Sequence, residues 1–135
     1  MKRVLTSILT IAAILLAISS CATVPKGPLE PGEMRLLSLE VPDKGNLQLS
    51  IQYQLTIKFR ADGHPEVRRV CFTWSGDGPH CTRPKSVQFG SDAYLEVLFS
   101  PPEDRHLLEC YVEYVRDGKV RRTNTVSSFV YGRIL

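Results

Sequence analysis

Apolar and polar residues alternate through most of the chain that follows Met34. The clearest example runs from Leu47 to Phe59, where seven apolar side chains occupy every second position and the residues between them are polar. A period of two is typical of a β-strand with one face in a core and the other in water. We therefore expect residues 47–59 to form one half-buried antiparallel strand.

Turn-forming residues divide the rest of the chain into further alternating segments. Gly, Pro, Asp and Ser gather at three breaks, residues 61–65, 75–79 and 101–102, and these residue types favour turns. Alternation between the breaks predicts more strands, near residues 37–41, 70–74, 95–99, 108–114 and 120–130, with residues 86–89 as a weaker candidate. The Asp117-Gly118 pair predicts a hairpin because both residues accept the positive φ of a type I′ turn. The pattern therefore predicts about seven strands.

About seven short strands separated by turns are typical of a β-sandwich or a small barrel. Residues 34–135 are enough for one domain with a single modest core. The segment around Cys110 and the Asp-Gly turn resembles the closing strands of immunoglobulin-like and fibronectin-like domains, and Trp74 is similar to the core tryptophan of that fold. The resemblance implies an all-β, immunoglobulin-like antiparallel sandwich. Tyr53 or Leu55 stands where the family has its first cysteine, which puts the inter-sheet disulfide of that family in question.

Residues 1–20 have the three-part layout of an export signal. Lys2 and Arg3 precede an apolar run over residues 4–18, and small residues then lead to Cys21. The run of 15 residues is shorter than the ~20 needed to cross a bilayer, which argues against a permanent transmembrane anchor. Ile18-Ser19-Ser20-Cys21 resembles the lipobox of bacterial lipoproteins, which implies removal of residues 1–20 and lipidation of Cys21. An ordinary cleaved signal with an incidental cysteine is the alternative.

The lipoprotein resemblance implies a place in the cell envelope. Ala22, a non-acidic residue after the lipidated cysteine, is by the same resemblance permissive for the outer membrane, with the domain facing the periplasm. In residues 21–33 prolines recur at every third position, Pro25, Pro28 and Pro31, and proline fixes φ and lacks an N–H donor. We expect an extended tether that holds the domain up to ~37 Å from the bilayer at ~3.1 Å per residue. A disordered tail has the same composition.

Net charge excludes one large class of partners. Beyond residue 21 the chain has 15 basic and 14 acidic residues, a net charge of +1. So small a net charge creates no long-range field of one sign, and nucleic acid is not expected as a partner. The local basic pairs Arg68-Arg69 and Arg121-Arg122 are expected to be solvated strand positions.

Strand parity separates the three remaining cysteines. Cys71 faces away from the core side of its strand, and a turn over residues 75–77 places it opposite Cys81. Cross-strand neighbours are close enough for a disulfide in an oxidising compartment, so a Cys71–Cys81 bridge is predicted. Cys110 has the core-facing parity, where a free cysteine behaves as a small hydrophobe. Bridges from Cys110 to either of the others remain alternatives, because one β-bulge would reverse the parity.

The candidate catalytic residues form no recognisable set. Ligand types suited to zinc occur at Cys71, His80, Cys81 and His106, and a cysteine beside a histidine could act as a nucleophile and base. Their spacing matches no compact motif, and the carboxylates in the turns specify no acid–base pair, at Asp62, Glu66, Glu103 and Asp104. We therefore expect no catalytic residues, no bound metal and no cofactor.

The closing hairpin carries the candidate binding residues. Pairing about Asp117-Gly118 places Glu113 opposite Arg122 and Tyr111 opposite Asn124, all pointing away from the core. A mixed polar face with a tyrosine suits an interaction surface, and it is equally typical of a solvated sheet.

Three functions follow from these features. The first is a non-catalytic, membrane-anchored lipoprotein that binds or accompanies another envelope protein. The second is a surface ligand- or polysaccharide-binding module, which would expose clustered aromatics such as Tyr94, Tyr111 and Tyr131. The third is an enzyme based on the cysteines and histidines. The first fits the sequence best.

Overall fold

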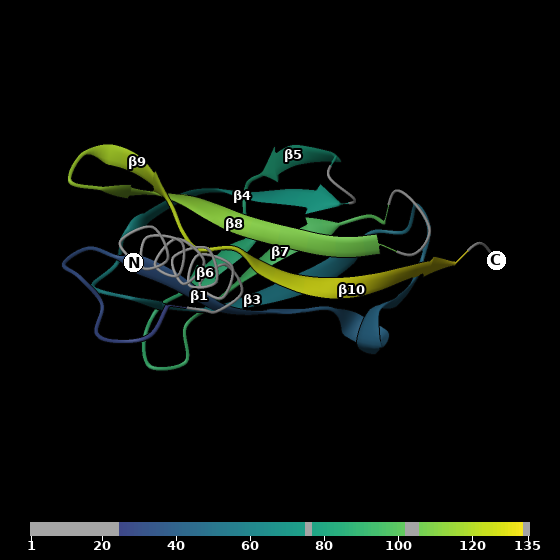
Figure 1. Cartoon of the computed structure of the whole chain (residues 1–135), viewed down its shortest axis with the longest axis horizontal. Helices are drawn as coiled ribbons and strands as arrows, with labels where there is room; N and C mark the ends of the chain where they lie inside the picture. Colours follow the sequence, from purple (N-terminus) through teal and green to yellow (C-terminus); the bar gives the residue numbers. More distant parts are fainter. Residues whose placement is uncertain (1–24, 75–76, 102–105, 134–135) are drawn as a thin grey trace, which may run out of the picture.

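Two β-sheets pack face to face in the computed structural model, which describes residues 25–74, 77–101 and 106–133 (Figure 1). One sheet contains, in spatial order, β1 (Met34–Glu40), β3 (Tyr53–Ala61), β7 (Tyr94–Phe99) and β6 (Ser86–Gln88). The other contains β2 (Asn46–Gln48), β10 (Val126–Arg133), β8 (His106–Arg116), β4 (Glu66–Trp74) and β5 (Asp77–Thr82). A further strand, β9 (Lys119–Arg122), pairs with β8, and a short 3-10 turn, η1 (Pro42–Gly45), precedes β2.

The strand order is that of an immunoglobulin-like sandwich. The order β1-β3-β7-β6 corresponds to the A-B-E-D sheet of that fold, and β10-β8-β4-β5 corresponds to G-F-C-C′. Neighbouring strands are antiparallel except β2 and β10, which pair in parallel. The predicted all-β sandwich is confirmed. The described residues form ten strands rather than about seven, in part because two of the predicted strands are interrupted.

The first interruption falls within residues 47–59, where one continuous strand was predicted. β2 ends at Gln48 and pairs with β10, whereas β3 begins at Tyr53 and belongs to the other sheet. Ser50, with a φ of 61°, turns the backbone between them. Leu47 and Leu55 are both buried in the same core. The alternation of apolar residues therefore continues from β2 into β3 and gives no sign that the strand is broken between them.

The second interruption falls within residues 120–130. β9 ends at Arg122, and Thr123 then donates its N–H to the Val112 carbonyl and accepts the Val112 N–H on its hydroxyl, each at 2.9 Å. These two bonds end the hairpin before β10 begins. The predicted Asp-Gly turn is confirmed, because Asp117 and Gly118 both have positive φ, 52° and 71°.

The core lies between the two sheets and is almost entirely aliphatic and aromatic. Phe72 and Trp74 on β4 pack against Phe99 on β7, with ring centroids 5.4 and 6.1 Å apart. The largest fully buried side chains come from both sheets, among them Leu36, Leu55, Ile57, Phe59, Val70, Leu95, Leu108 and Val112. Burial of one such side chain contributes ~1.5–3 kcal/mol. This burial explains why alternation located most of the strands.

Residues 25–33 lie against the sandwich instead of extending away from it. The Arg35 guanidinium donates to the carbonyls of Pro25 and Gly27 at 3.2 and 2.8 Å. Arg116 on β8 donates to the Pro31 carbonyl at 2.9 Å. The segment is largely exposed, as a tether would be, but it is not the free spacer that was expected. The export signal, Cys21 and the first tether residues lie outside the described residues.

Candidate interaction surface

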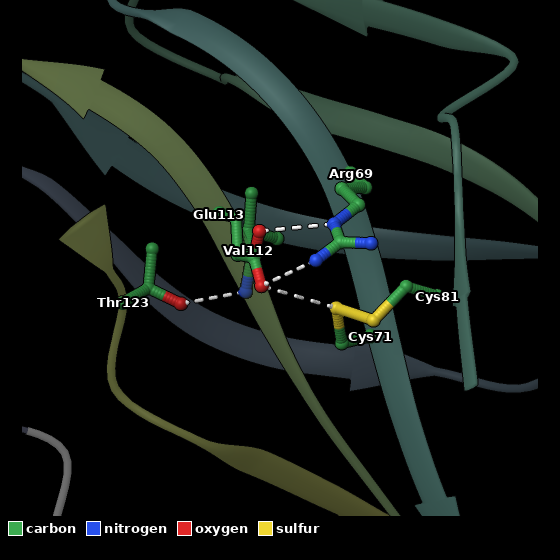
Figure 2. Close-up of a disulfide and its surroundings, with 6 residues drawn as sticks. All are labelled: Arg69, Cys71, Cys81, Val112, Glu113 and Thr123. Atoms are coloured by element: carbon green, nitrogen blue, oxygen red, sulfur yellow. Dashed lines mark hydrogen bonds and ion pairs between the residues drawn. A yellow bond between two sulfur atoms is a disulfide. The ribbon is translucent and has the colours of Figure 1, made fainter. Parts of the chain in front are cut away.

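An ion pair joins the two central strands of the large sheet. Arg69 on β4 lies directly opposite Glu113 on β8. Its guanidinium donates two hydrogen bonds to the carboxylate, from Nε to Oε2 at 2.9 Å and from Nη2 to Oε1 at 3.2 Å (Figure 2). The Glu113 side chain is only 11% exposed, whereas that of Arg69 is 53% exposed. The hydrogen bond from Arg69 to Glu113 also raises the pKa of Arg69.

The disulfide lies beside this pair. Cys71 on β4 and Cys81 on β5 are register partners and are bonded, as predicted (Figure 2). Cys71 Sγ lies 3.8 Å from Glu113 Oε1, and this is a contact because a disulfide sulfur has no proton to donate. Cys110 is free and buried, so its alternative bridges are not formed. The bridge lies within one sheet and differs from the inter-sheet disulfide of immunoglobulin domains.

Tyr111 and Arg122 extend the same surface. The Arg122 guanidinium carbon lies 4.8 Å from the centroid of the Tyr111 ring, in cation–π geometry. Arg122 is also the register partner of Glu113, as predicted. Arg69, Tyr111, Glu113 and Arg122 thus form a continuous surface over three strands, which we call the outer face.

An open groove of about 900 Å³ borders the outer face. Its lining comes from residues 66–69 of β4, residues 81–84 at and after the end of β5, Glu113 and Val120. Within the lining, the Glu66 carboxylate forms an ion pair of 3.4 Å with Arg68, and Glu113 neutralises the charge of Arg69. Arg83 has no ion pair with any residue in the described ranges. The groove is therefore polar and slightly cationic.

Two of the predicted binding residues have structural roles. Asn124 does not lie opposite Tyr111 on the outer face. Its side chain bonds to the main chain of Leu36 on β1, so the outward placement was wrong. Glu113 does face outward, but Arg69 and the disulfide cover it, and its carboxylate holds the two central strands together.

The structure does not gather the candidate zinc and nucleophile residues whose side chains it describes. His80 on β5 stacks on Trp74 with ring centroids 4.1 Å apart, and Cys81 is in the disulfide. Cys71, Cys81 and Glu113 lie within 4.8 Å of one another, but two bonded sulfurs do not offer the thiolates that bind zinc. Burial raises the pKa of the Cys110 thiol to about 12, which keeps it protonated and unreactive. His106 contributes its main chain to β8.

The candidate carboxylates that the structure describes, Asp62 and Glu66, have separate partners. Asp62 accepts the Gly32 N–H at 2.8 Å, and Glu66 pairs with Arg68. Asp62 and Glu66 therefore each serve a structural contact. Glu103 and Asp104 lie outside the described residues.

The exposed aromatics form one small cluster that the sequence did not reveal. Phe129 is 54% exposed and stacks on Tyr131 with ring centroids 6.5 Å apart. Leu107, 37% exposed, is the register partner of Phe129, and we call these three residues the apolar patch. Tyr94 lies in the other sheet, so the three tyrosines considered above do not cluster. Neighbouring side chains of a strand point to opposite faces, so the exposure of Phe129 could have been predicted once Val130 was assigned to the core.

No protein-family model matches the chain, and no curated protein matches it at a significant level. Among the described residues, no helix is long and apolar enough to cross a membrane.

Proposed function

We propose that the protein is a lipid-anchored lipoprotein of the cell envelope whose non-catalytic sandwich binds another envelope protein through the outer face. The lipobox-like segment ending at Cys21 supports the anchor. The observation that carries the binding proposal is the outer face itself, where Arg122 covers Tyr111 beside the Arg69–Glu113 pair at the rim of a groove of about 900 Å³.

The chemistry of this surface suits a protein partner. Tyrosine and arginine are enriched among the residues that dominate binding energy at protein interfaces. The bidentate Arg69–Glu113 bond holds the rim in one geometry, which reduces the ordering cost of association. Arg83 offers a positive charge without an ion partner in the described ranges, so an acidic side chain on the partner complements the groove.

Crosslinking in intact cell envelopes tests the binding surface. We expect wild type to crosslink to a partner that the Tyr111→Ala/Arg122→Ala variant loses, with the fold nearly unchanged. The matched control is Glu40→Ala/Lys58→Ala, which removes an exposed ion pair of 3.0 Å from the other sheet and should keep the partner. Retention of every partner by the first variant would overturn the assignment of the outer face.

The anchor has its own test. The mature chain should begin at a lipidated Cys21 followed by Ala22, and Cys21→Ser should give a soluble or uncleaved form. Intact mass and partitioning into detergent measure both properties. Wild-type protein that is fully soluble at its unlipidated mass would remove the basis for the envelope location.

A ligand- or polysaccharide-binding role is the second candidate, and the apolar patch is the observation that favours it. Stacked aromatic rings offer flat apolar area to a ligand. If this function holds, Phe129→Ala/Tyr131→Ala should lose binding to purified envelope polysaccharide, and the outer-face variant should keep it. Stoichiometric zinc that His80→Ala abolishes would instead support an enzyme.

A further inference from the structure

Residues 25–33 are fastened to one end of the sandwich. Arg35 holds Pro25 and Gly27, and Arg116, the last residue of β8, holds Pro31 and the Glu30 carboxylate at 2.9 and 2.8 Å. In Figure 1 the segment of residues 25–33 and strand β9 lie at the same end of the molecule, and the arrowheads of β4 and β10 point towards the opposite end. The chain therefore enters the domain beside the β8–β9 hairpin.

This fastening shortens the reach of the anchor. Cys21 precedes Pro25 by four residues, a span of at most ~14 Å at ~3.6 Å per residue. A free spacer over the whole of residues 22–33 would have allowed more than twice that distance. With Cys21 acylated, the hairpin end of the domain stays close to the bilayer surface.

The hairpin end is also where positive charge is concentrated. Residues 116–122 contain four cationic side chains and one carboxylate, whereas the rest of the chain beyond residue 21 has 11 basic and 13 acidic residues. Lys119 and Arg121 are exposed and form no ion pair with a residue of the described ranges. Val120 between them is 58% exposed. The hairpin thus presents two unneutralised cations on one face of β9, and Val120 between them in sequence lies on the opposite face, at the groove.

We propose that the β8–β9 hairpin rests on anionic phosphate headgroups of the bilayer that holds the lipid anchor, with Lys119 and Arg121 as the contacting cations. The proposal rests on the acylation of Cys21 given under Proposed function. Attraction between cations and an anionic surface acts within a Debye length of ~8–10 Å, and the short free segment keeps the hairpin near that range. Lys119 and Arg121 alternate with Val120 and Arg122 along β9, so the contact leaves the outer face open.

Depth-dependent quenching tests the contact with the full lipidated protein. The protein is reconstituted into phosphatidylcholine vesicles with or without phosphatidylglycerol, and a spin-labelled lipid serves as the quencher. Val120→Trp places the reporter between the two cations in sequence, on the other face of β9, so it reports on how close the hairpin lies to the lipid. The control is Phe129→Trp, which places the reporter at an exposed aromatic position of β10. Phe129 and the native Trp74 lie at the same level of the sheet, because Phe129 pairs with Leu107 and Trp74 pairs with Leu108.

We expect quenching of the Val120→Trp emission in anionic vesicles, loss of that quenching at high salt, and little quenching of Phe129→Trp. In the Val120→Trp background, Lys119→Glu should lower the ratio of docked to undocked protein by about fivefold per unit of charge. Lys44→Glu makes the same charge change in η1, where Gly45 lies against Phe129, and should have little effect.

The outcomes separate this proposal from the anchor. If Cys21 is acylated by mass and Val120→Trp is quenched in neither vesicle type, the hairpin contact is overturned and the anchor stands. Equal, salt-insensitive quenching in both vesicle types would overturn the phosphate assignment in favour of apolar insertion by Val120. An unacylated Cys21 overturns both proposals.

Discussion

Asn124 forms with the main chain of Leu36 the two hydrogen bonds that a neighbouring strand would form. Its Oδ1 accepts the Leu36 N–H at 2.8 Å, and its Nδ2 donates to the Leu36 carbonyl at 2.9 Å. Leu36 lies in β1 of the four-stranded sheet, and Asn124 follows β9 of the other sheet. One amide side chain therefore links the two layers of the sandwich.

Asn124→Ala should destabilise the protein by ~1–3 kcal/mol, because Leu36 is buried and its polar groups would lose their partners. Chemical denaturation followed by circular dichroism measures the change. Thr125→Ala, at the exposed neighbouring position, is the control and should change stability by less than ~0.5 kcal/mol. Equal effects of the two substitutions would contradict the linking role.

Gly45→Ala should destabilise the protein more than Gly63→Ala does. Both glycines have positive φ, 86° and 72°, so alanine is strained at either position. A Cβ at Gly45 would also collide with the Phe129 carbonyl, whereas a Cβ at Gly63 would meet nothing within 4 Å. The difference between their denaturation midpoints isolates the collision from the backbone strain. Equal midpoints would show that β10 moves aside without cost.

Removal of the disulfide should lower stability by ~2–3 kcal/mol, because the bridge closes a short loop between residues ten positions apart. Cys71→Ala/Cys81→Ala and chemically reduced wild type should both show this loss, and reductant should have no further effect on the double variant. Peptide mapping without reduction should recover one Cys71–Cys81 bridge. A linked peptide containing Cys110 would contradict the assignment.

Cys110 should resist alkylation until the protein unfolds, because its thiol is buried and its pKa is raised to about 12. In the unfolded protein the thiol has its ordinary pKa of 9.0. Between pH 9 and pH 12, therefore, the thiol keeps its proton in the folded protein and loses it in the unfolded protein. Stability associated with this thiol is therefore complete below about pH 9 and is lost as the pH rises towards 12. The free energy of unfolding should fall less steeply over this range in Cys110→Ala than in wild type.

The same substitution at two adjacent positions on β8 should cause a large loss of stability at one and a small loss at the other. Val112 is fully buried, so Val112→Asp leaves an unpaired charge in the core at a cost of ~3–5 kcal/mol and should unfold the protein. Tyr111→Asp, at a half-buried outward position, removes the cation–π contact with Arg122, worth ~0.5–1 kcal/mol, and does not place the new carboxylate in the core. Thermal melts of the two variants make the comparison. Similar melting temperatures would show that the parity of β8 is wrong.

Local parity explains which features could be predicted from sequence. Cys71 and Cys81 flank one turn, so alternation alone placed them opposite each other, and the same reasoning put Cys110 in the core. The break between β2 and β3 was missed because Leu47 and Leu55 face one core from different sheets. Alternation reports which side of a strand is buried, and it does not report which sheet the strand joins.

The roles of Asn124 and Glu113 depend on contacts between distant parts of the chain. Asn124 bonds to a residue 88 positions earlier, and Glu113 to one 44 positions earlier. Asn124 stands in a polar run that resembles any exposed turn. Glu113 has the outward parity that was predicted, and only the packing of Arg69 and the disulfide around it removes it from solvent.

The segment of residues 25–33, which is bonded to the sandwich before β1, also determines how the domain would carry mechanical load. A pull on the chain before Pro25 first loads the bonds from Arg35 in β1 to Pro25 and Gly27, and then the bonds from Arg116 in β8 to residues 30 and 31. The force thereby acts in succession on an edge strand of one sheet and an inner strand of the other. Tension at the N-terminal side must therefore break contacts with both layers in turn before the chain can peel β1 away from its N-terminal end.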